Sequence, residues 1–280
     1  MLPILSIKQF DTKISEGDFY SNHLEKHLVR NKNIIHKAHK HDFFLCVLFT
    51  SGTGSHNIDF NVYDIKAGSL FFLKPGQTHS WEFTSQPKGF IFFHTEDFYD
   101  CHFSNHNLSQ YPFYFSHTNP PFLNVKQAAL ADISQQFKAI NTEHGKEGAF
   151  KNQKIASLIT ALYIDISRLY IDYSEFKMVS SVTALDIIEK LEQSIERYYR
   201  THKSASFYAS KLNISPKHLN RVTRATINKT TTEVIAERVI LEAKRLIVHT
   251  FSSLNDIAIS LGFEDYAYFS KVFKQKTNST

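Results

Sequence analysis

Two short stretches near the carboxyl end of the chain carry side chains that can hydrogen-bond to nucleic-acid bases. At about 100° per residue, the turn of a helix, each stretch gathers its polar side chains on one arc. The first arc holds Lys217, His218, Asn220, Arg221 and Arg224, and the second holds Tyr266, Ala267, Ser270, Lys271 and Lys274. Arg and Lys can pair with guanine O6 and N7, and Asn with adenine. Neither arc contains a carboxylate, so we expect two faces that fit the DNA major groove.

Each of these helices belongs to a predicted helix-turn-helix. In the second copy, Ser253 and Asp256 have the spacing of a capping box that opens a helix. Apolar residues then recur at the helical period, at Leu254, Ile257, Ala258 and Leu261. Gly262 can take the positive φ of a tight turn, and a second helix follows over about Asp265–Gln275. Its apolar arc holds Tyr268, Phe269, Val272 and Phe273.

The first copy repeats this pattern between Phe207 and Asn228. Ala209 and Leu212 match Ala258 and Leu261, and Leu219 and Val222 match Phe269 and Val272. Asn213 replaces Gly262, and Asn also tolerates a left-handed backbone. A helix predicted over about Thr232–Val248 joins the copies, and its seventeen residues span about 25 Å. That length could hold two recognition helices near one DNA turn, about 34 Å, apart.

The stretch that begins at Arg238 resembles the DNA-binding domain of AraC-family transcriptional regulators. The resemblance covers about residues 203–277 and rests on the ordered set Arg238, Ala243, Leu246, Ile257, Ala258, Gly262, Phe263, Tyr268, Phe269 and Phe273. It implies base-reading positions at Lys217, Asn220 and Arg221, and at Tyr266, Ala267, Ser270 and Lys271. Two departures stand out. Thr223 occupies a position where the family usually has a buried aromatic, and Tyr266 replaces a common Pro. The sequence ends at Thr280, before the family's usual Pro-containing tail, which leaves open whether the protein is longer.

The charge balance agrees with a polyanionic partner. Residues 1–175 carry 16 Lys and Arg against 17 Asp and Glu, whereas residues 176–280 carry 16 against 10. The net charge of +5 therefore comes entirely from the part with the repeated motif. Cys46 and Cys101 show no metal-ligand spacing and indicate no disulfide framework. No secretory leader or membrane span is recognisable, so we expect a cytoplasmic protein.

The stretch of about Ile34–Phe98 has the short strands and Gly/Pro punctuation of a β-sandwich or barrel. Expected strands include Phe43–Thr50, His56–Val62, Gly68–Leu73, Trp81–Thr84 and Gly89–His94. His39 and His41, followed by Gly68, Pro75, Gly76 and His79, resemble the cupin-type sensor domain usual at the amino terminus of this family. A barrel mouth lined by His39, His41, His79 and Trp81 would suit a small organic ligand.

The same histidines allow a second hypothesis, a metal-dependent cupin enzyme fused to a DNA-binding tail. Three imidazoles can bind a divalent metal, and His39, His41 and His79 would be the ligands. The downstream Glu of metal-binding cupins is missing, however, so we expect no metal, no cofactor and no catalytic residue.

Helical periodicity returns over residues 123–173, with helices expected at about Val125–Ile140 and Phe150–Tyr173. These helices could simply cover the barrel, but in the family they form a dimer seam, and the narrow apolar stripe allows that here. We therefore expect an α+β protein: a cupin-like sensor and dimerisation domain at 1–175, a linker at 176–182, and an all-α double helix-turn-helix domain at 183–280. The expected function is sequence-specific, ligand-responsive transcription regulation by a homodimer on double-stranded DNA, with RNA polymerase left open as a further partner.

Overall fold

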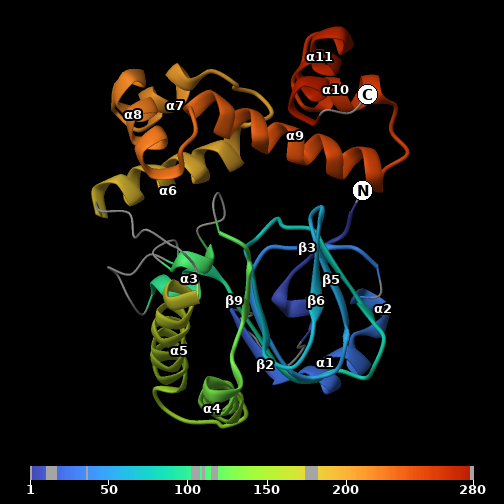
Figure 1. Ribbon diagram of the computed structural model, residues 1–280, viewed down its shortest axis with the longest axis vertical. Helices are drawn as coiled ribbons and strands as arrows, with labels where there is room; N and C mark the ends of the chain where they lie inside the picture. Colours follow the sequence, from blue (N-terminus) through green and yellow to red (C-terminus); the bar gives the residue numbers. More distant parts are fainter. Residues whose placement is uncertain are drawn as a thin grey trace. The chain divides into compact units, whose positions relative to one another are not determined.

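A computed structural model describes residues 2–10, 18–35, 37–101, 108, 111–114, 119–173 and 182–277. The chain divides into two compact units, residues 2–176 and 177–280. The first is rich in strands, and the described part of the second is helical (Figure 1). Residues 176–181 of the predicted linker 176–182 lie outside the described part of the chain. None of the described helices combines the length and hydrophobicity that crossing a membrane requires.

Three sheets make up the first unit. Five antiparallel strands lie in the order β10-β7-β4-β9-β2, three more in the order β6-β5-β8, and β1 pairs with β3 in parallel. The strands are β1 (Ile4–Leu5), β2 (Phe19–His23), β3 (Lys40–His41), β4 (Phe44–Ser51), β5 (Gly54–Ile58), β6 (Asn61–Ile65), β7 (Ser69–Leu73), β8 (His79–Phe83), β9 (Lys88–His94) and β10 (Phe122–Asn124). Short helices α1 (Leu24–Arg30), α2 (Lys32–Ile35) and α3 (Glu96–Asp100) complete this part.

Strand β4 is apolar from Phe44 to Phe49, because both of its faces are buried over that length. Leu45 and Val47 belong to the core that includes Ile58 and Ile65 of the three-stranded sheet, whereas Cys46 belongs to the core shared with the helices beyond. Successive side chains of a strand point to opposite faces. A strand with no polar side therefore marks a sheet that is covered on both sides.

One expected strand, His56–Val62, is in fact a hairpin. Strand β5 ends at Ile58 and β6 begins at Asn61, and the two pair in antiparallel fashion. Asp59 turns the chain with a left-handed φ of 53°, a conformation that Asp adopts more readily than most residues. Alternation alone continues through such a turn, which is why the break was not expected.

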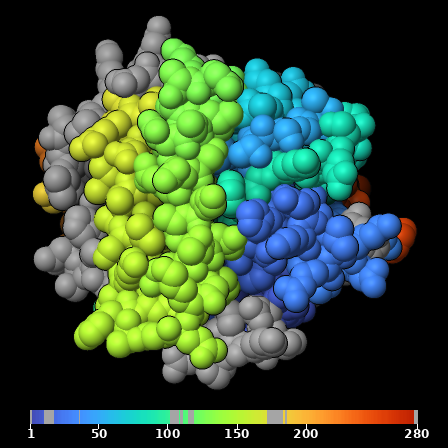
Figure 2. Space-filling view, turned by 90° about the horizontal axis from the view of Figure 1, so that it is seen from below, coloured from blue at the N-terminus to red at the C-terminus, as the bar shows by residue number. Residues whose placement is uncertain are grey.

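Helices α4 (Gln127–His144) and α5 (Lys151–Tyr173) cover the outer face of the five-stranded sheet, and α4 lies beside α5 (Figure 2). The expected helical segment 123–173 thus begins with strand β10 at its first residues. The apolar stripe of α5 is buried in this core, at Ile155, Ile159, Leu162, Ile166 and Tyr170. The stripe that could have served a dimer seam therefore packs against the barrel of its own chain.

The second unit is built around one long helix. Its elements are α6 (Val182–Tyr198), α7 (Ala205–Lys211), α8 (Pro216–Ile227), α9 (Thr231–His249), α10 (Leu254–Ser260) and α11 (Tyr266–Thr277). Helix α9 opens with a capping box between Thr230 and Glu233. An ion network with a buried centre ties α9 to α6: Arg238 bonds to the exposed Glu196 and to the buried Glu242, and the buried Arg245 also bonds to Glu242. These charges are paired, as buried charges must be.

Candidate nucleic-acid interface and sensor site

The first helix-turn-helix motif consists of α7 and α8. Ser204 and Ser215 cap the two helices, each accepting a backbone N–H with its hydroxyl oxygen. Asn213 in the turn has φ 55°, and Asn228 ends α8 with φ 53°. Asn213 therefore supplies the left-handed position that the sequence predicted for it, and Asn228 adopts the same conformation at the end of α8.

Helix α8 has the two faces that the sequence predicted. Leu219, Val222, Thr223 and Ile227 are buried, whereas Lys217, Arg221 and Arg224 are exposed. His218 and Asn220 are half-buried at the border between the faces. Three cations of the candidate DNA-binding set therefore share an open surface on this helix.

Asn220 is engaged within the domain. Its Oδ1 accepts the backbone N–H of Thr231, the first residue of α9, at 3.2 Å. Bidentate pairing with adenine needs both the oxygen and the NH₂ of the amide, and the oxygen is already in use. The bond to Thr231 ties the amide to α9, so a bidentate contact with adenine would have to compete with a bond inside the domain, which the spacing of the sequence could not reveal.

Thr223 takes part in the same contact between α8 and α9. Its hydroxyl lies 3.1 Å from the carbonyl of Asn220, to which it donates, and 3.3 Å from Oγ1 of Thr231. Thr223 is fully buried. Where the family resemblance implied an aromatic side chain, this chain thus has a polar contact that links the recognition helix to the start of α9.

Arg221 is held in place by its neighbour. Its Nη2 donates to Nδ1 of His218 at 3.0 Å. The guanidinium has further N–H groups that this bond does not use. Because part of the side chain's freedom is already lost in the free protein, Arg221 is better ordered for base contact than an unsupported arginine.

The second motif consists of α10 and α11. Ser253 caps α10, since its oxygen accepts the N–H of Asp256 at 3.1 Å. The Asp256 carboxylate accepts the serine hydroxyl rather than closing the full capping box. Gly262 forms the turn with φ 73°. A Cβ placed there would lie 1.8 Å from the carbonyl oxygen of Arg200, so a side chain is excluded.

Helix α11 exposes Tyr266, Ala267, Lys271 and Lys274, with Ser270 half-buried among them. Phe269 packs inward and is 2 % exposed. Tyr268, expected on the apolar arc, is instead 58 % exposed. It lies at the edge of that arc, where its ring reaches Phe263 at a centroid distance of 5.9 Å.

The two motifs lie at opposite ends of α9 (Figure 1), and both pack against it. The helix has 19 residues, which corresponds to about 28 Å. The separation of α8 and α11 on a duplex stays a prediction.

In the amino-terminal unit, the four candidate pocket residues come together. His39, His41 and His79 are 3 %, 1 % and 1 % exposed. The centroid of the His79 ring is 4.4 Å from that of His39, 5.1 Å from that of His41 and 4.9 Å from that of Trp81. A fourth histidine, His56, joins them, with its Nε2 3.0 Å from Nδ1 of His79. The sequence held a signal for His56, because it alternates with the buried Ile58 on β5.

These imidazoles are neutral and only partly hydrogen-bonded. Burial lowers the pKa of all four, to about 3 for His41. Nδ1 of His39 donates to the carbonyl of Lys37, and Nδ1 of His41 to that of Phe43, each at 2.8 Å. Among the described residues, His41 Nε2, His56 Nδ1, His79 Nε2 and Trp81 Nε1 have no hydrogen-bond partner. Such atoms are costly to bury alone.

The geometry does not fit the metal site that a cupin enzyme would need. In the part of the chain that the structure describes, no three His, Cys, Asp or Glu side chains are placed so that they could hold one ion. The hydrogen bonds from Nδ1 of His39 and His41 to backbone carbonyls would suit metal ligands. His79 is not placed so that it could join them as the third ligand of one ion.

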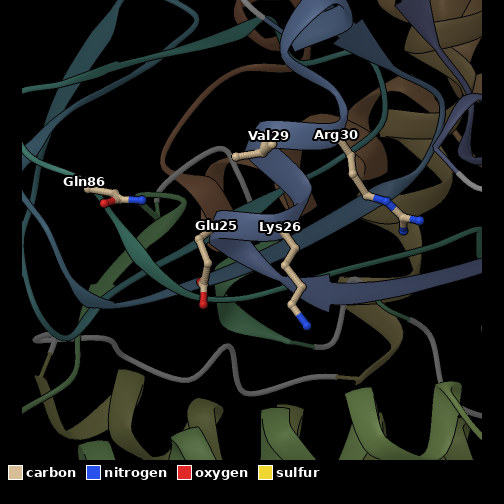
Figure 3. A pocket seen from close by; sticks show the side chains of 5 residues that line it. All are labelled: Glu25, Lys26, Val29, Arg30 and Gln86. Atoms are coloured by element: carbon tan, nitrogen blue, oxygen red, sulfur yellow. The ribbon is translucent and has the colours of Figure 1, made fainter.

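Two cavities lie beside α1. One, of about 370 Å³, is lined by Glu25, Lys26, Val29 and Arg30 of α1 and by Gln86 (Figure 3). The other, of about 510 Å³, lies between β2, α1 and the α4–α5 connection, and shares Lys26 and Arg30 with the first. Both were unexpected from the sequence, and none of the candidate pocket residues lines them.

Comparison with known proteins shows the same two domains. Residues 208–280 match the family model of a helix-turn-helix domain, and residues 23–95 match that of an AraC-like ligand binding domain. The HTH-type transcriptional activator RhaR of Escherichia coli O139:H28 (strain E24377A / ETEC) is 21% identical over 271 residues, which cover 96% of this chain and 94% of RhaR.

Solved structures are also similar to this chain. ToxT from Vibrio cholerae is 14% identical, with a TM-score of 0.45 over 94% of this chain and 96% of ToxT. The C-terminal domain of AraT, a response regulator from Geobacillus stearothermophilus, is 22% identical and covers 34% of this chain and 78% of that domain, with a TM-score of 0.32. With both family domains present in one chain, and a relative aligned over nearly its full length, the chain belongs to the AraC family of transcription regulators.

Proposed function

We propose that this protein regulates transcription by binding double-stranded DNA through α8 and α11. The observation that carries the proposal is the pair of exposed helix faces, rich in Lys and Arg and without a carboxylate, at the two ends of α9 (Figure 1). Residues 176–280 also carry the entire basic excess of the chain. Phosphate attraction supplies most of the affinity of such a surface, and the grooves supply sequence preference.

The two helices would divide the work between bases and phosphates. On α8, Lys217 and Arg221 contact bases, and Arg224 contacts phosphate. On α11, Tyr266, Ala267, Ser270 and Lys271 face the bases, and Lys274 contacts phosphate. His218 acts through Arg221, to which it is hydrogen-bonded. Asn220 contributes less than these residues, since its oxygen already bonds to Thr231.

Selection from random double-stranded DNA at low salt tests this function directly. The protein should enrich a bipartite site, with one block of sequence for each motif and about one helical turn between the block centres. The affinity for that site should fall steeply as salt rises. A protein that enriches no sequence, and binds no duplex at low ionic strength, would contradict the proposed function.

We further propose that the amino-terminal domain responds to a small polar molecule at the histidine cluster. Two observations support this. His41 Nε2 is an acceptor without a donor, because the Nδ1 of that ring already carries the proton given to Phe43. Trp81 Nε1 is a donor without an acceptor. A ligand with both hydroxyl-type donors and acceptors would satisfy both groups, and a regulator requires that it bind one conformation better than another.

Trp81 is the one tryptophan of the sequence, so its fluorescence reports on this cluster alone. Fractionated small-molecule extracts should change the emission of the wild-type protein, and the active fraction should change its DNA affinity. The variant His41→Phe should lose the fluorescence response while it keeps DNA binding. A fraction that changes DNA affinity equally in the wild-type protein and in this variant would place the effector elsewhere.

We propose that the protein acts by binding and not by catalysis, because the family that it belongs to consists of regulators and the histidines do not fit a metal. Elemental analysis of purified protein tests the competing metal-enzyme hypothesis. Stoichiometric zinc, iron or manganese that disappears in His39→Ala or His79→Ala would favour that hypothesis.

We also propose that the protein works as a homodimer in the cytoplasm, where DNA and RNA polymerase are available to it. A bipartite operator bound by each subunit would raise affinity through a second linked contact. Because the apolar stripe of α5 is buried in the core of its own domain, a dimer interface would have to use another face of α4 and α5. Sedimentation analysis at micromolar concentration would show a single monomeric species if the dimer is wrong.

A further inference from the structure

The turn of the second motif makes a close backbone contact with the connection that leads into the first motif. The connection between α6 and α7 approaches the turn between α10 and α11 so closely that a Cβ on Gly262 would lie 1.8 Å from the carbonyl oxygen of Arg200. Gly262 has φ 73° and no side chain, so the turn can press against this connection. The contact joins the α6–α7 connection, which leads into the first motif, to the α10–α11 turn, which sets the direction of the second recognition helix.

Lys203 holds this contact together. Its Nζ donates to the carbonyl of Gly262 at 2.9 Å and to that of Arg200 at 3.2 Å. The same ammonium lies 4.8 Å from the centroid of the Phe263 ring. Lys203 of the α6–α7 connection thus bonds to the backbone on both sides of the contact, and it also lies on the ring of Phe263, which follows the turn.

The chemistry of this arrangement suits an ammonium. A Lys head group has three donors and no acceptor, and here two carbonyl oxygens and a ring face surround it. Hydrogen bonds from a charged donor are stronger than neutral ones, and an aromatic face also attracts a cation. Lys203 is half-buried, and this burial lowers the pKa of its ammonium.

We propose that Lys203 is a positioning residue that sets the orientation of the second motif relative to the first, and with it the spacing between the two blocks of the DNA site. The inference rests on the proposed DNA-binding function. Helix α9 fixes how far apart the motifs lie, but a motif that packs on a rod can still rotate around it. The bond from Lys203 to Gly262, 59 residues away in sequence, restrains that rotation at the base of α11.

The test is parallel selection from random DNA with the wild-type protein, Lys203→Met and Lys211→Met. Lys203→Met keeps an apolar stem against Phe263 and removes the charge and the donors. Lys211 is the matched control, because its Nζ lies over the rings of Tyr198 and Phe207, at 5.3 and 5.6 Å, in the first motif and its supporting helix. The spacer length between the two enriched blocks is the readout, since a side chain with a purely stabilising role would not change it.

We expect one dominant spacer for the wild-type protein and for Lys211→Met. Lys203→Met should enrich the same two blocks with a broader range of spacers, and should bind the wild-type site about ten-fold more weakly, a factor within the range of couplings between sites. A wild-type spacer distribution in Lys203→Met would overturn the inference, as would loss of the block sequences themselves, which would mean that Lys203 maintains the fold.

If Lys203→Met unfolds below the temperature of the selection, Lys203→Arg replaces it. The guanidinium keeps the charge but is planar and longer, so the preferred spacer should shift or broaden, and an unchanged spacer would overturn the inference. A wild-type protein that enriches no bipartite site would be a failure of the proposed function itself, which separates the two outcomes.

Discussion

The two helix-turn-helix motifs follow one pattern but are anchored differently. Helix α8 buries four of its residues and ends in a left-handed cap at Asn228. Helix α11, all of which is described, buries only Phe269. The turn of the first motif uses Asn213, which has a side chain, whereas Gly262 in the second is pressed against the backbone at Arg200.

The two recognition helices are therefore stabilised by different kinds of contact. The first helix is held by its own apolar face and by polar contacts from Asn220 and Thr223 to Thr231. The second buries fewer of its own residues, and the backbone contact at Gly262 and the Lys203 bond that spans it add to its support. We therefore expect the first motif to tolerate changes in its turn and the second to be sensitive to them.

The largest effect should come from Gly262→Ala. A left-handed φ costs a residue with a Cβ about 1–2 kcal/mol, and overlap with Arg200 adds about 1–3 kcal/mol, so the free energy of unfolding should fall by about 3 kcal/mol. The matched change Asn213→Ala meets only the first cost and should lose about 1 kcal/mol. Urea unfolding of the full chain, followed by far-UV circular dichroism, measures both. Equal losses in the two variants would remove the difference between the turns.

Much of this arrangement was available from the sequence. The capping serine at Ser253, the glycine turn and the period of Ile257 and Ala258 predicted the second motif, because local geometry selects those residue types. The strand expected over Phe43–Thr50 was also found, as β4, because a run of apolar residues marks a strand that is buried on both faces. Helices, strands and turns of this kind can be predicted from the sequence because the residues that form them are close together in the chain.

What the sequence could not provide depends on contacts between distant residues. The bond from Asn220 to Thr231 and that from Lys203 to Gly262 have no local pattern. The hairpin at Asp59 was also missed, because alternation runs through it. His56 could have been placed beside His79 only once β5 was known to pair with β8.

The next effect in size concerns sequence preference. Arg221→Ala should lower the preference for its base pair by about 10- to 100-fold, within the 1–3 kcal/mol of a good bidentate contact, because His218 already orders the side chain. Lys271→Ala, at the matching position of α11, should lose less than about ten-fold, since an ammonium is a flexible point charge. Competition binding against single-base variants of the selected site measures both. If Arg221→Ala keeps the wild-type preference, the assigned face of α8 is wrong.

A smaller effect should separate Asn220 from Ser270, its counterpart on α11. Asn220→Ala removes the acceptor for the Thr231 N–H at the start of α9, which should cost about 1 kcal/mol of stability. Asn220→Asp keeps an acceptor and should retain the stability, while its carboxylate weakens DNA binding by repelling phosphate. Ser270→Ala should change stability by less than about 0.5 kcal/mol, because Ser270 is half-buried and lies outside the buried core of the domain. Thermal unfolding and DNA titration of the three variants test this, and an unaltered melting temperature in Asn220→Ala would return Asn220 to a purely base-reading role.

The smallest expected effect is one in which the two motifs should agree. Arg224 and Lys274 are both exposed near the ends of their recognition helices, and both are proposed to contact phosphate. Each phosphate contact releases counterions, so the slope of log K against log salt should become shallower by about 0.9 in Arg224→Ala and in Lys274→Ala. Base preference should stay unchanged in both variants, because phosphates carry no sequence information. Binding measured across a salt series tests both variants. If only Arg224→Ala changes the slope, Lys274 does not contact the DNA backbone. The weaker anchoring of the second motif would then extend to its contact with DNA.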